Sequence, residues 1–454
     1  MLPKSVRFDR GTLELGADVP SVDHALWDPR TETRRAAAFR FHDIATAADA
    51  IGMELHGDLR RNWSVRPLNA AALELRSYQA QALASWAAFS RRGVVALPTG
   101  AGKTRVAIAA LFETGLPAAD LCPTKVLATA WVDELRRHLG EAVGLVGDGQ
   151  RSIERVTVLT FESAYRHMDA LGDRFGLLVV DEVHHFGGGA RVEALEASAA
   201  VARLGLTATM PEPGSEAAAR LGGLIGPTVF EMGYADLVGT HLANVAMVRV
   251  PVRLEVDERA EYDARMRVFL EMRRTFMRLH PEADVVTLLR GLGRTPDGRR
   301  ALRDRARALE LASFPRAKRS LLRTLLDRHR NDRAIVFTAF AENAYDAARD
   351  NLVPVITGET GARERQEILA AFRDGRVRAI ASARVLNEGI DVPEARVAII
   401  VAGALGPREH VQRIGRVLRP APDKEALVYE LVTTNTSDAR RAQQRARYAP
   451  RRST

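Results

Sequence analysis

The sequence predicts an α/β protein with two domains built on parallel sheets, a small mixed α/β domain before them and a helical insertion between them. Short apolar runs alternate with segments of helical composition in two separate stretches of the chain. Such runs, bounded by turn or charged residues, are typical of buried parallel strands joined by helices. Between the two stretches the sequence is charged, arginine-rich and helical in pattern. The length of 454 residues suggests about three domains of roughly 150 residues each.

The apolar runs give the expected strands. In the first α/β domain they are Gly93–Leu97, Val156–Leu159, Leu177–Val180 and Val201–Leu206. In the second they are Ala334–Phe337, Val353–Ile356, Val377–Ala381, Val397–Val401 and Leu427–Val432. Helical patterns cover Ala36–Leu55, Glu258–Leu279 and Arg299–Ala312. We therefore predict a small domain over 1–72, α/β domains over 73–234 and 319–435, a helical insertion over 235–318 and a basic flexible tail over 436–454.

Composition narrows the class of protein. A single cysteine, Cys122, excludes a disulfide framework, a zinc ribbon and a cysteine-ligated iron–sulfur cluster. There is no apolar run of membrane-spanning length, and the N-terminus lacks the apolar core of a signal peptide. We expect a monomer in the cytoplasm of a prokaryote, associated with the nucleoid and with no membrane partner.

The chain is strongly basic. A net charge of +9 and a pI of about 10.1 favour an anionic partner. Nearly all of this charge is arginine, and with so much alanine it could equally reflect a GC-rich genome. Lysine occurs only at positions 4, 103, 125, 318 and 424. Because lysine is so rare in this chain, we take the one inside a glycine-rich loop, Lys103, as a candidate functional residue.

That lysine belongs to Pro98–Thr104, which follows an expected strand and precedes an apolar helical pattern. This context is typical of a phosphate-binding loop. Gly100 and Gly102, with Thr99 and Ala101, would let backbone N–H groups approach the phosphates of ATP. Lys103 would hold the β and γ phosphates, and Thr104 would ligate Mg²⁺ through its hydroxyl.

Two acids follow the run Leu177–Val180, which places carboxylates at the carboxyl edge of the sheet beside the loop. Asp181 would hold Mg²⁺, and Glu182 would orient and activate the attacking water. His184 and His185 could suggest a metal, but two adjacent histidines without cysteine are a poor ligand set. We favour His184 as a polar coupler near the γ phosphate.

Two further segments of the first domain carry polar groups. Arg76-Ser77-Tyr78-Gln79 lies upstream of the loop, and the Gln79 amide could recognise the adenine edge. The alternative is an ordinary glutamine on a helix surface. Thr207-Ala208-Thr209 closes a strand, and its hydroxyls could bond to the Asp181–His184 segment and couple ATP state to domain motion.

The second α/β domain offers cations. Arg416 and Arg419 share a face if Gln412–Arg419 is a helix, so both could reach a γ phosphate. Gln412 lies in the same segment, and Gly389-Ile390-Asp391 precedes it. Taken alone, this segment could also be an arginine-rich surface helix.

In order, these segments, together with Pro123-Thr124 and Thr160-Phe161, resemble the motifs of superfamily-two helicases, and among them the XPB helicases of the compact archaeal and bacterial type. Leu97 stands where the general phosphate loop has glycine, a position that helicase-like loops commonly relax. The resemblance rests on strings such as Asp181-Glu182-Val183-His184-His185 and on those at 204–209 and 385–393. Phe8–Leu13 and Trp27–Arg30 resemble the opening of that family's damage-recognition domain. The resemblance implies two RecA-like domains and a thumb-like insertion.

The resemblance also implies ATP-driven movement on duplex or forked DNA, with 3′-to-5′ polarity, in DNA repair or processing. DNA would be held mainly through its phosphates by Thr124 and Arg384. Alternatives are a duplex translocase serving a separately encoded nuclease without strand separation, a related RNA helicase and a catalytically idle adaptor. One departure matters: the family's Arg-Glu-Asp triplet is absent, and the corresponding stretch, Met210–Glu216, holds two prolines. We therefore expect translocation on duplex DNA to exceed strand separation.

Overall fold

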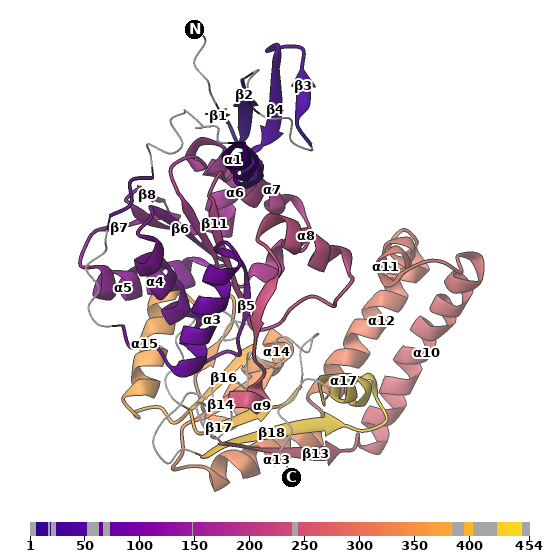
Figure 1. Cartoon of the computed structure of the whole chain (residues 1–454). Helices are drawn as coiled ribbons and strands as arrows, with labels where there is room; N and C mark the ends of the chain where they lie inside the picture. The colour runs from indigo at the N-terminus through magenta and orange to yellow at the C-terminus, as the bar shows by residue number, and fades with distance from the viewer. Residues whose placement is uncertain are drawn as a thin grey trace. The chain divides into compact units, whose positions relative to one another are not determined.

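The structure is a computed structural model of the chain (Figure 1). It describes residues 6–16, 19, 24–51, 63–66, 73–147, 149–237, 244–383, 395–402 and 425–446. The chain divides into two compact units, Met1–Asp236 and Leu237–Thr454, and each is described by itself. The fold class predicted above is confirmed: the elements form a small antiparallel sheet and two larger, mainly parallel sheets with helices.

The first unit opens with a small antiparallel sheet in the order β1-β2-β4-β3. Its strands are β1 (Val6–Asp9), β2 (Thr12–Leu15), β3 (Leu26–Asp28) and β4 (Thr33–Ala37). Alternation along β2 sends Leu13 and Leu15 into the core and Glu14 outward to Arg35, whose Nη1 lies 2.8 Å from its Oε1. A 3₁₀ turn (Ala38–Arg40) and helix α1 (Phe41–Ala50) close the core. The helix begins later than predicted because Ala36 and Ala37 belong to β4.

The large sheet of the first unit has, among the described residues, the strand order β12-β5-β11-β10-β6-β9-β7-β8. Neighbouring strands are parallel except for β8, which runs antiparallel to β7. The strands are β5 (Arg92–Ala96), β6 (Ala118–Cys122), β7 (Val143–Gly147), β8 (Gln150–Ser152), β9 (Val156–Thr160), β10 (Leu177–Val180), β11 (Ala202–Thr207) and β12 (Thr228–Glu231). The helices are α3 (Ser77–Ala88), α4 (Lys103–Thr114), α5 (Lys125–Leu139), α6 (Phe161–Leu171), α7 (Glu193–Glu196), α8 (Glu216–Leu224) and α9 (Tyr234–Leu237), with 3₁₀ turns at Val183–Phe186 and Ala190–Val192.

All four strands predicted for this domain are present. Strands β7, β8 and β12 were not predicted, and neither was β6, in the middle of the sheet. Its sequence, Ala-Ala-Asp-Leu-Cys, lacks the β-branched and aromatic residues that favour strands. It nevertheless lies between β10 and β9 with every residue buried. Small side chains suit a strand that is covered on both faces, so tertiary packing decides its conformation.

The second unit holds a parallel sheet in the order β13-β18-β17-β14-β16-β15. Its strands are β13 (Asn244–Val252), β14 (Ala334–Thr338), β15 (Val355–Ile356), β16 (Ala379–Ala383), β17 (Val397–Ile400) and β18 (Glu425–Thr433). Its helices are α10 (Val256–Leu279), α11 (Val285–Gly293), α12 (Pro296–Ser313), α13 (Arg316–Arg328), α14 (Ala341–Asn351), α15 (Ala362–Arg373) and α17 (Ser437–Ala446).

Two sequence expectations need correction here. The range 235–318 is not helical throughout, because β13 pairs along its whole length with β18 as part of the second sheet. Helices α10, α11 and α12, which we call the thumb helices, form the rest of the insertion. The tail is not flexible from residue 436, because α17 is a helix anchored by a buried ion pair between Lys318 Nζ and Asp438 Oδ2, 2.9 Å apart. Within the described residues, no helix has the length and apolar character needed to cross a membrane.

Candidate nucleotide-binding site

The predicted site segments of the first unit lie along one edge of its sheet. Strands β5, β11, β10, β6 and β9 are consecutive neighbours in space. Their carboxyl ends lead, in that order, into Pro98–Thr104, Thr207–Thr209, Asp181–His184, Pro123–Thr124 and Thr160–Phe161. In an open parallel sheet, ligands bind outside this edge. Five segments spread over more than a hundred residues of sequence therefore border one site.

The loop after β5 has the backbone of a phosphate cradle. Gly100 and Gly102 have φ values of 88° and 78°, which residues with a Cβ rarely adopt. Gly102 is the N-cap of α4, and Lys103 is its first residue, so the unpaired N–H groups of a helix start face the loop. Thr99 Oγ1 is buried and has no hydrogen-bond partner among the described residues. Such an orphaned hydroxyl fits a ligand oxygen.

Asp181 is buried beside this loop, with both carboxylate oxygens engaged. Its Oδ1 accepts the backbone N–H of Glu182 at 2.9 Å, and its Oδ2 accepts the indole N–H of Trp131 at 3.2 Å. Burial raises the pKa of Asp181, and the charge of Lys103 together with these two donors opposes that rise. The loop lysine and the metal-ligand candidate are thus in electrostatic contact.

A second buried carboxyl, Asp120, lies one strand away on β6. Neither of its oxygens has a hydrogen-bond partner among the described residues. Burial, reinforced by the charge of Asp181, raises the pKa of Asp120 to about 8. Asp120 therefore favours its neutral form at neutral pH, and Asp181 differs from it in having a nearby cation and two hydrogen-bond donors that oppose the effect of burial.

Glu182 has a strained backbone. Its φ and ψ are 47° and 46°, in the left-handed region. A residue with a side chain in this region costs roughly 1 to 2 kcal/mol, and such strain concentrates at functional sites. Glu182 Oε2 lies 3.4 Å from His184 Nδ1.

His184 joins two of the five segments. Its Nδ1 lies 3.0 Å from Thr207 Oγ1, and the Thr207 hydroxyl also accepts the backbone N–H of Thr209 at 3.1 Å. The contact expected between the threonine segment and the Asp181–His184 segment is present. Among the described residues, no group of three or more potential metal ligands occurs.

Gln79 lies against the phosphate loop, with both ends of its side-chain amide engaged. The side chain is buried, its Oε1 accepts the backbone N–H of Arg76 at 2.9 Å, and its Nε2 donates to Ala101 O at 2.8 Å. Tyr78 donates its hydroxyl to the same carbonyl at 2.7 Å. The amide thus supports the phosphate loop, and adenine recognition by Gln79 remains a proposal.

The residues predicted for the second half of the site lie outside the described residues, as does one DNA-contact candidate. They are Gly389, Asp391, Gln412, Arg416 and Arg419, and the DNA-contact candidate is Arg384.

The described residues fit ATP with Mg²⁺. Magnesium is held in proteins by one or two carboxylates together with phosphate oxygens and water. Asp181 supplies a carboxylate, and Thr104, in the first turn of α4, supplies a hydroxyl. The cradle of N–H groups and Lys103 provides for the phosphates.

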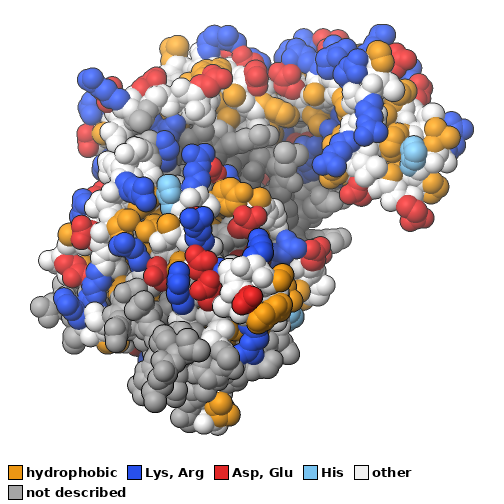
Figure 2. All heavy atoms as spheres, turned by 90° about the horizontal axis from the view of Figure 1, so that it is seen from above, with side chains coloured by type: hydrophobic (Ala, Val, Ile, Leu, Met, Phe, Trp, Pro, Cys, Tyr) orange, Lys and Arg blue, Asp and Glu red, His pale blue; other side chains and the backbone are white. Residues whose placement is uncertain are grey.

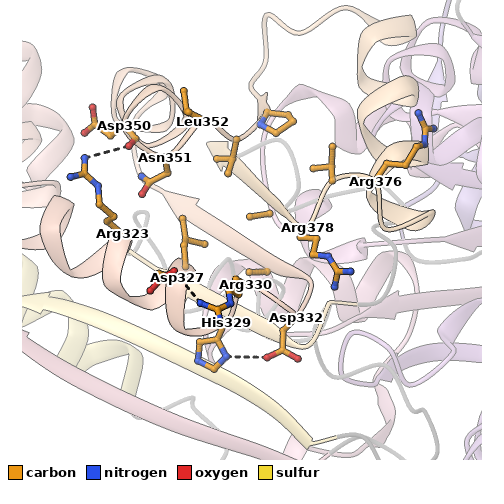
Figure 3. Close-up of a pocket in the computed structure, with 16 residues that line it drawn as sticks. Arg323, Asp327, His329, Arg330, Asp332, Asp350, Asn351, Leu352, Arg376 and Arg378 are labelled. Carbon is orange, nitrogen blue, oxygen red and sulfur yellow. Dashed lines mark hydrogen bonds and ion pairs between the residues drawn. The ribbon is translucent and has the colours of Figure 1, made fainter.

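A pocket of about 520 Å³ in the second unit holds none of the predicted site residues (Figure 3). It lies where β14 and β16 begin, the edge opposite to the carboxyl ends of the strands. Several of its charged side chains already have partners: Arg378 donates to Asn331 O at 2.7 Å, and His329 Nδ1 lies 3.1 Å from Asp332. The pocket is therefore separate from the residues of the candidate nucleotide site.

Trp131 and Asp120 were not found from the sequence. Trp131 is the seventh residue of α5, the helix that follows Pro123–Thr124, and its spacing there suggests only a core position. Asp120 gives one signal, a single acid inside an apolar run. That signal could not be used because the run was not recognised as a strand.

A glycine loop between a parallel strand and a helix, with a carboxylate after the next strand but one, defines a P-loop nucleotide hydrolase. A second parallel sheet in the same chain is typical of motor enzymes of the helicase class. Comparison with solved structures supports this fold: the helicase domain of Pyrococcus furiosus Hef matches 81% of the chain with a TM-score of 0.54, at 18% identity and over 97% of its own length.

Sequence comparisons identify the family. Residues 6–57 match the xeroderma pigmentosum group B helicase damage recognition domain, 72–212 the type III restriction enzyme res subunit, and 317–421 the helicase conserved C-terminal domain. The chain is 33% identical to the DNA 3′-5′ translocase XPB2 of Sulfurisphaera tokodaii, over 97% of this chain and 99% of the relative. It is 29% identical to the DNA 3′-5′ helicase XPB of Kineococcus radiotolerans, over 96% and 76%. The chain belongs to the XPB family of superfamily-two DNA helicases.

Proposed function

We propose that this chain is an ATP-dependent DNA motor of XPB type that moves 3′-to-5′ on DNA in repair or DNA processing. The observation that carries the proposal is the row of five motif segments along the carboxyl ends of adjacent strands, with Lys103 and Asp181 in electrostatic contact. The family membership and the names of the relatives agree with it.

In the proposed mechanism the residues of the first unit have separate tasks. The loop amides and Lys103 bind the ATP phosphates, and Thr104 and Asp181 hold Mg²⁺, which when bound would neutralise charge that develops on the phosphates. Glu182 accepts a proton from the attacking water. Its left-handed backbone fixes where its carboxylate points. His184 and Thr207 carry the resulting change to the neighbouring segment.

The second unit would complete the site. We assign Arg416 and Arg419 to the γ phosphate, with Gln412, Gly389 and Asp391 in supporting roles. Two cations there would stabilise charge in the transition state of hydrolysis. Their release after hydrolysis would reopen the site.

DNA is the proposed track, and the thumb helices offer a surface for it. Where the thumb joins the sheet, its arginines are paired with acids, as in Arg259 with Asp263 and Arg265 with Asp304. Farther out lie exposed arginines whose side chains form no hydrogen bond or ion pair with any described residue, namely Arg273, Arg274, Arg294, Arg300 and Arg303. Basic side chains are dense on this lobe in Figure 2. Such surface arginines can bind the phosphates of DNA, and contacts to phosphates do not depend on the base sequence.

The absence of the Arg-Glu-Asp triplet favours movement on duplex DNA over strand separation. We propose that the chain acts as a monomer in the cytoplasm of a prokaryote, near the nucleoid, and that any DNA cutting comes from a separately encoded nuclease. A triplex-displacement assay and a forked-duplex unwinding assay, run on one preparation, separate these activities.

The first test removes the loop lysine. Lys103→Ala should abolish DNA-stimulated ATP hydrolysis, because the β and γ phosphates lose their cation. Arg105→Ala is a matched control, since Arg105 is a cation two residues away whose guanidinium already donates to Glu74 O at 2.9 Å. Full activity in Lys103→Ala would overturn the site assignment.

A further inference from the structure

Trp131 is the single described side chain that donates a hydrogen bond to Asp181. The indole N–H lies 3.2 Å from Oδ2, and both side chains are buried. The other Asp181 oxygen is held by the adjacent backbone N–H of Glu182. The orientation of the carboxylate is thus set by one backbone group and one indole.

The partner of Trp131 is unlike that of the other buried tryptophans. Trp86, on α3, donates its indole N–H to the backbone carbonyl of Arg203 at 2.9 Å. Trp63 donates to the backbone carbonyl of Asp173, also at 2.9 Å. Both bonds join an indole to a backbone carbonyl elsewhere in the fold. Only Trp131 donates to a side chain that the proposed mechanism uses.

Asp181 has a particular need for such a donor. Asp181 is buried next to a second carboxyl group, that of Asp120. The oxygens of Asp120 have no described hydrogen-bond partner. A buried carboxylate without donors is costly, and a hydrogen bond to the charged form favours ionisation. The indole N–H supplies that bond and fixes which lone pairs of Asp181 remain for a ligand.

Trp131 also connects Asp181 to α5, the helix that Thr124 caps. The Thr124 hydroxyl caps α5 by accepting the N–H of Leu127 at 3.3 Å. Seven residues later, almost two helical turns on, Trp131 returns to a similar side of the helix. A displacement of the start of α5 would therefore be transmitted to the Oδ2 of Asp181 through one rigid element.

We propose that Trp131 is a positioning residue that orients Asp181 for Mg²⁺ and links it to the Thr124 end of α5. This inference rests on the proposed nucleotide site. Trp131 acts through Asp181 and touches no reacting atom. Its loss should therefore weaken the cooperation between Mg²⁺ and nucleotide while leaving nucleotide binding without Mg²⁺ unchanged.

The experiment measures the affinity of a fluorescent ADP analogue for the full chain in EDTA and in Mg²⁺, by titration. Trp131→Phe removes the donor and keeps an aromatic ring. We expect the gain in affinity on adding Mg²⁺ to fall roughly tenfold relative to the unaltered chain, the size of one hydrogen bond to a charged group. Trp86→Phe is the matched control, because it removes a buried indole bond to a backbone carbonyl and should leave the Mg²⁺ effect intact.

A second measurement tests the proposal on the unaltered chain, for the case in which Trp131→Phe does not fold. In the unaltered chain labelled with ¹⁵N-tryptophan, the Trp131 indole N–H resonance should shift on adding Mg²⁺ to the ADP-bound protein and in Asp181→Asn, while the Trp86 and Trp63 resonances stay in place. The resonances are assigned by changing Trp27, Trp63 and Trp86 to Phe one at a time.

The outcomes separate the two proposals. An equal Mg²⁺ effect in the unaltered chain and Trp131→Phe, or a Trp131 resonance unmoved by Mg²⁺ and by Asp181→Asn, overturns the inference alone. No Mg²⁺ effect on nucleotide affinity in the unaltered chain overturns the proposed site and, with it, the inference.

Discussion

His184 and Thr207 form a bridge between neighbouring strand ends, with Nδ1 and Oγ1 3.0 Å apart. Thr207 ends β11, which lies between the strand of the phosphate loop and the strand of the two acids. Its hydroxyl donates to Thr209 O at 2.9 Å, so one oxygen serves His184 and the turn after β11. A change at the acids can therefore reach that turn through two contacts.

Removing the Thr207 hydroxyl should uncouple hydrolysis from movement. Thr207→Val keeps the shape but leaves His184 and Thr209 N–H without their partner, at a cost of roughly 1 to 3 kcal/mol. We expect DNA-stimulated ATPase activity to persist and triplex displacement per ATP to fall by about tenfold. Thr209→Val is the control, because Thr209 Oγ1 is buried without a described hydrogen-bond partner. Equal coupling in both variants would contradict the bridge.

The phosphate loop should not tolerate a methyl group at Gly102. Its φ is 78°, and a Cβ would lie 2.6 Å from Gln79 Nε2, the group that supports the loop. Gly102→Ala should lose nucleotide binding and lower the free energy of unfolding of the first unit by more than about 1 kcal/mol. Gly214 has the same φ of 78° with no atom within 4 Å of its Cβ position. Gly214→Ala should therefore show the backbone cost alone, with nucleotide affinity unchanged by titration.

The buried Asp120 should make the first unit less stable as pH rises. Its pKa is raised from 3.8 to about 8. Between these values the native state binds a proton that the unfolded chain has released, so the free energy of unfolding falls with increasing pH. The slope from this group is at most about 1.4 kcal/mol per pH unit. Asp120→Asn has no such proton, and urea unfolding from pH 5 to 8 should show a flatter dependence than in the unaltered chain. Parallel curves would contradict the assignment.

The outer thumb arginines should set much of the salt dependence of DNA binding. Changing Arg273, Arg274 and Arg303 to Ala removes three cations whose side chains have no partner among the described residues, and each phosphate contact contributes about 0.9 to the slope of log K against log salt. We expect the slope to fall by up to about 3, without a change of sequence preference. The control changes Arg259, Arg265 and Arg307, which already pair with acids. Fluorescence anisotropy at several salt concentrations gives both slopes, and equal slopes would place DNA elsewhere.

The sequence was sufficient for the parts of the fold that local pattern determines. The phosphate loop and the acids after β10 were predicted because each follows an apolar strand, and strand order then brings them together. β13 was missed because the decision to form a strand there depends on β18, far along the chain. Helix α17 was predicted as flexible because its surface is basic, while its anchoring depends on Asp438 meeting the buried Lys318. The role of Trp131 depends on a contact between α5 and β10 that no spacing reveals.

The position of β18 in the second sheet has a consequence for the order in which the chain folds during synthesis. β18 lies between β13 and β17, so β13 has its only described sheet partner near the end of the chain. At typical ribosomal rates, on the order of ten seconds or more separate the emergence of Val252 from that of Glu425. During that interval β13 presents an unpaired strand edge while the first unit can already fold. A nascent chain stalled before residue 425 should therefore hold a folded first unit and a second unit open to proteases and chaperones.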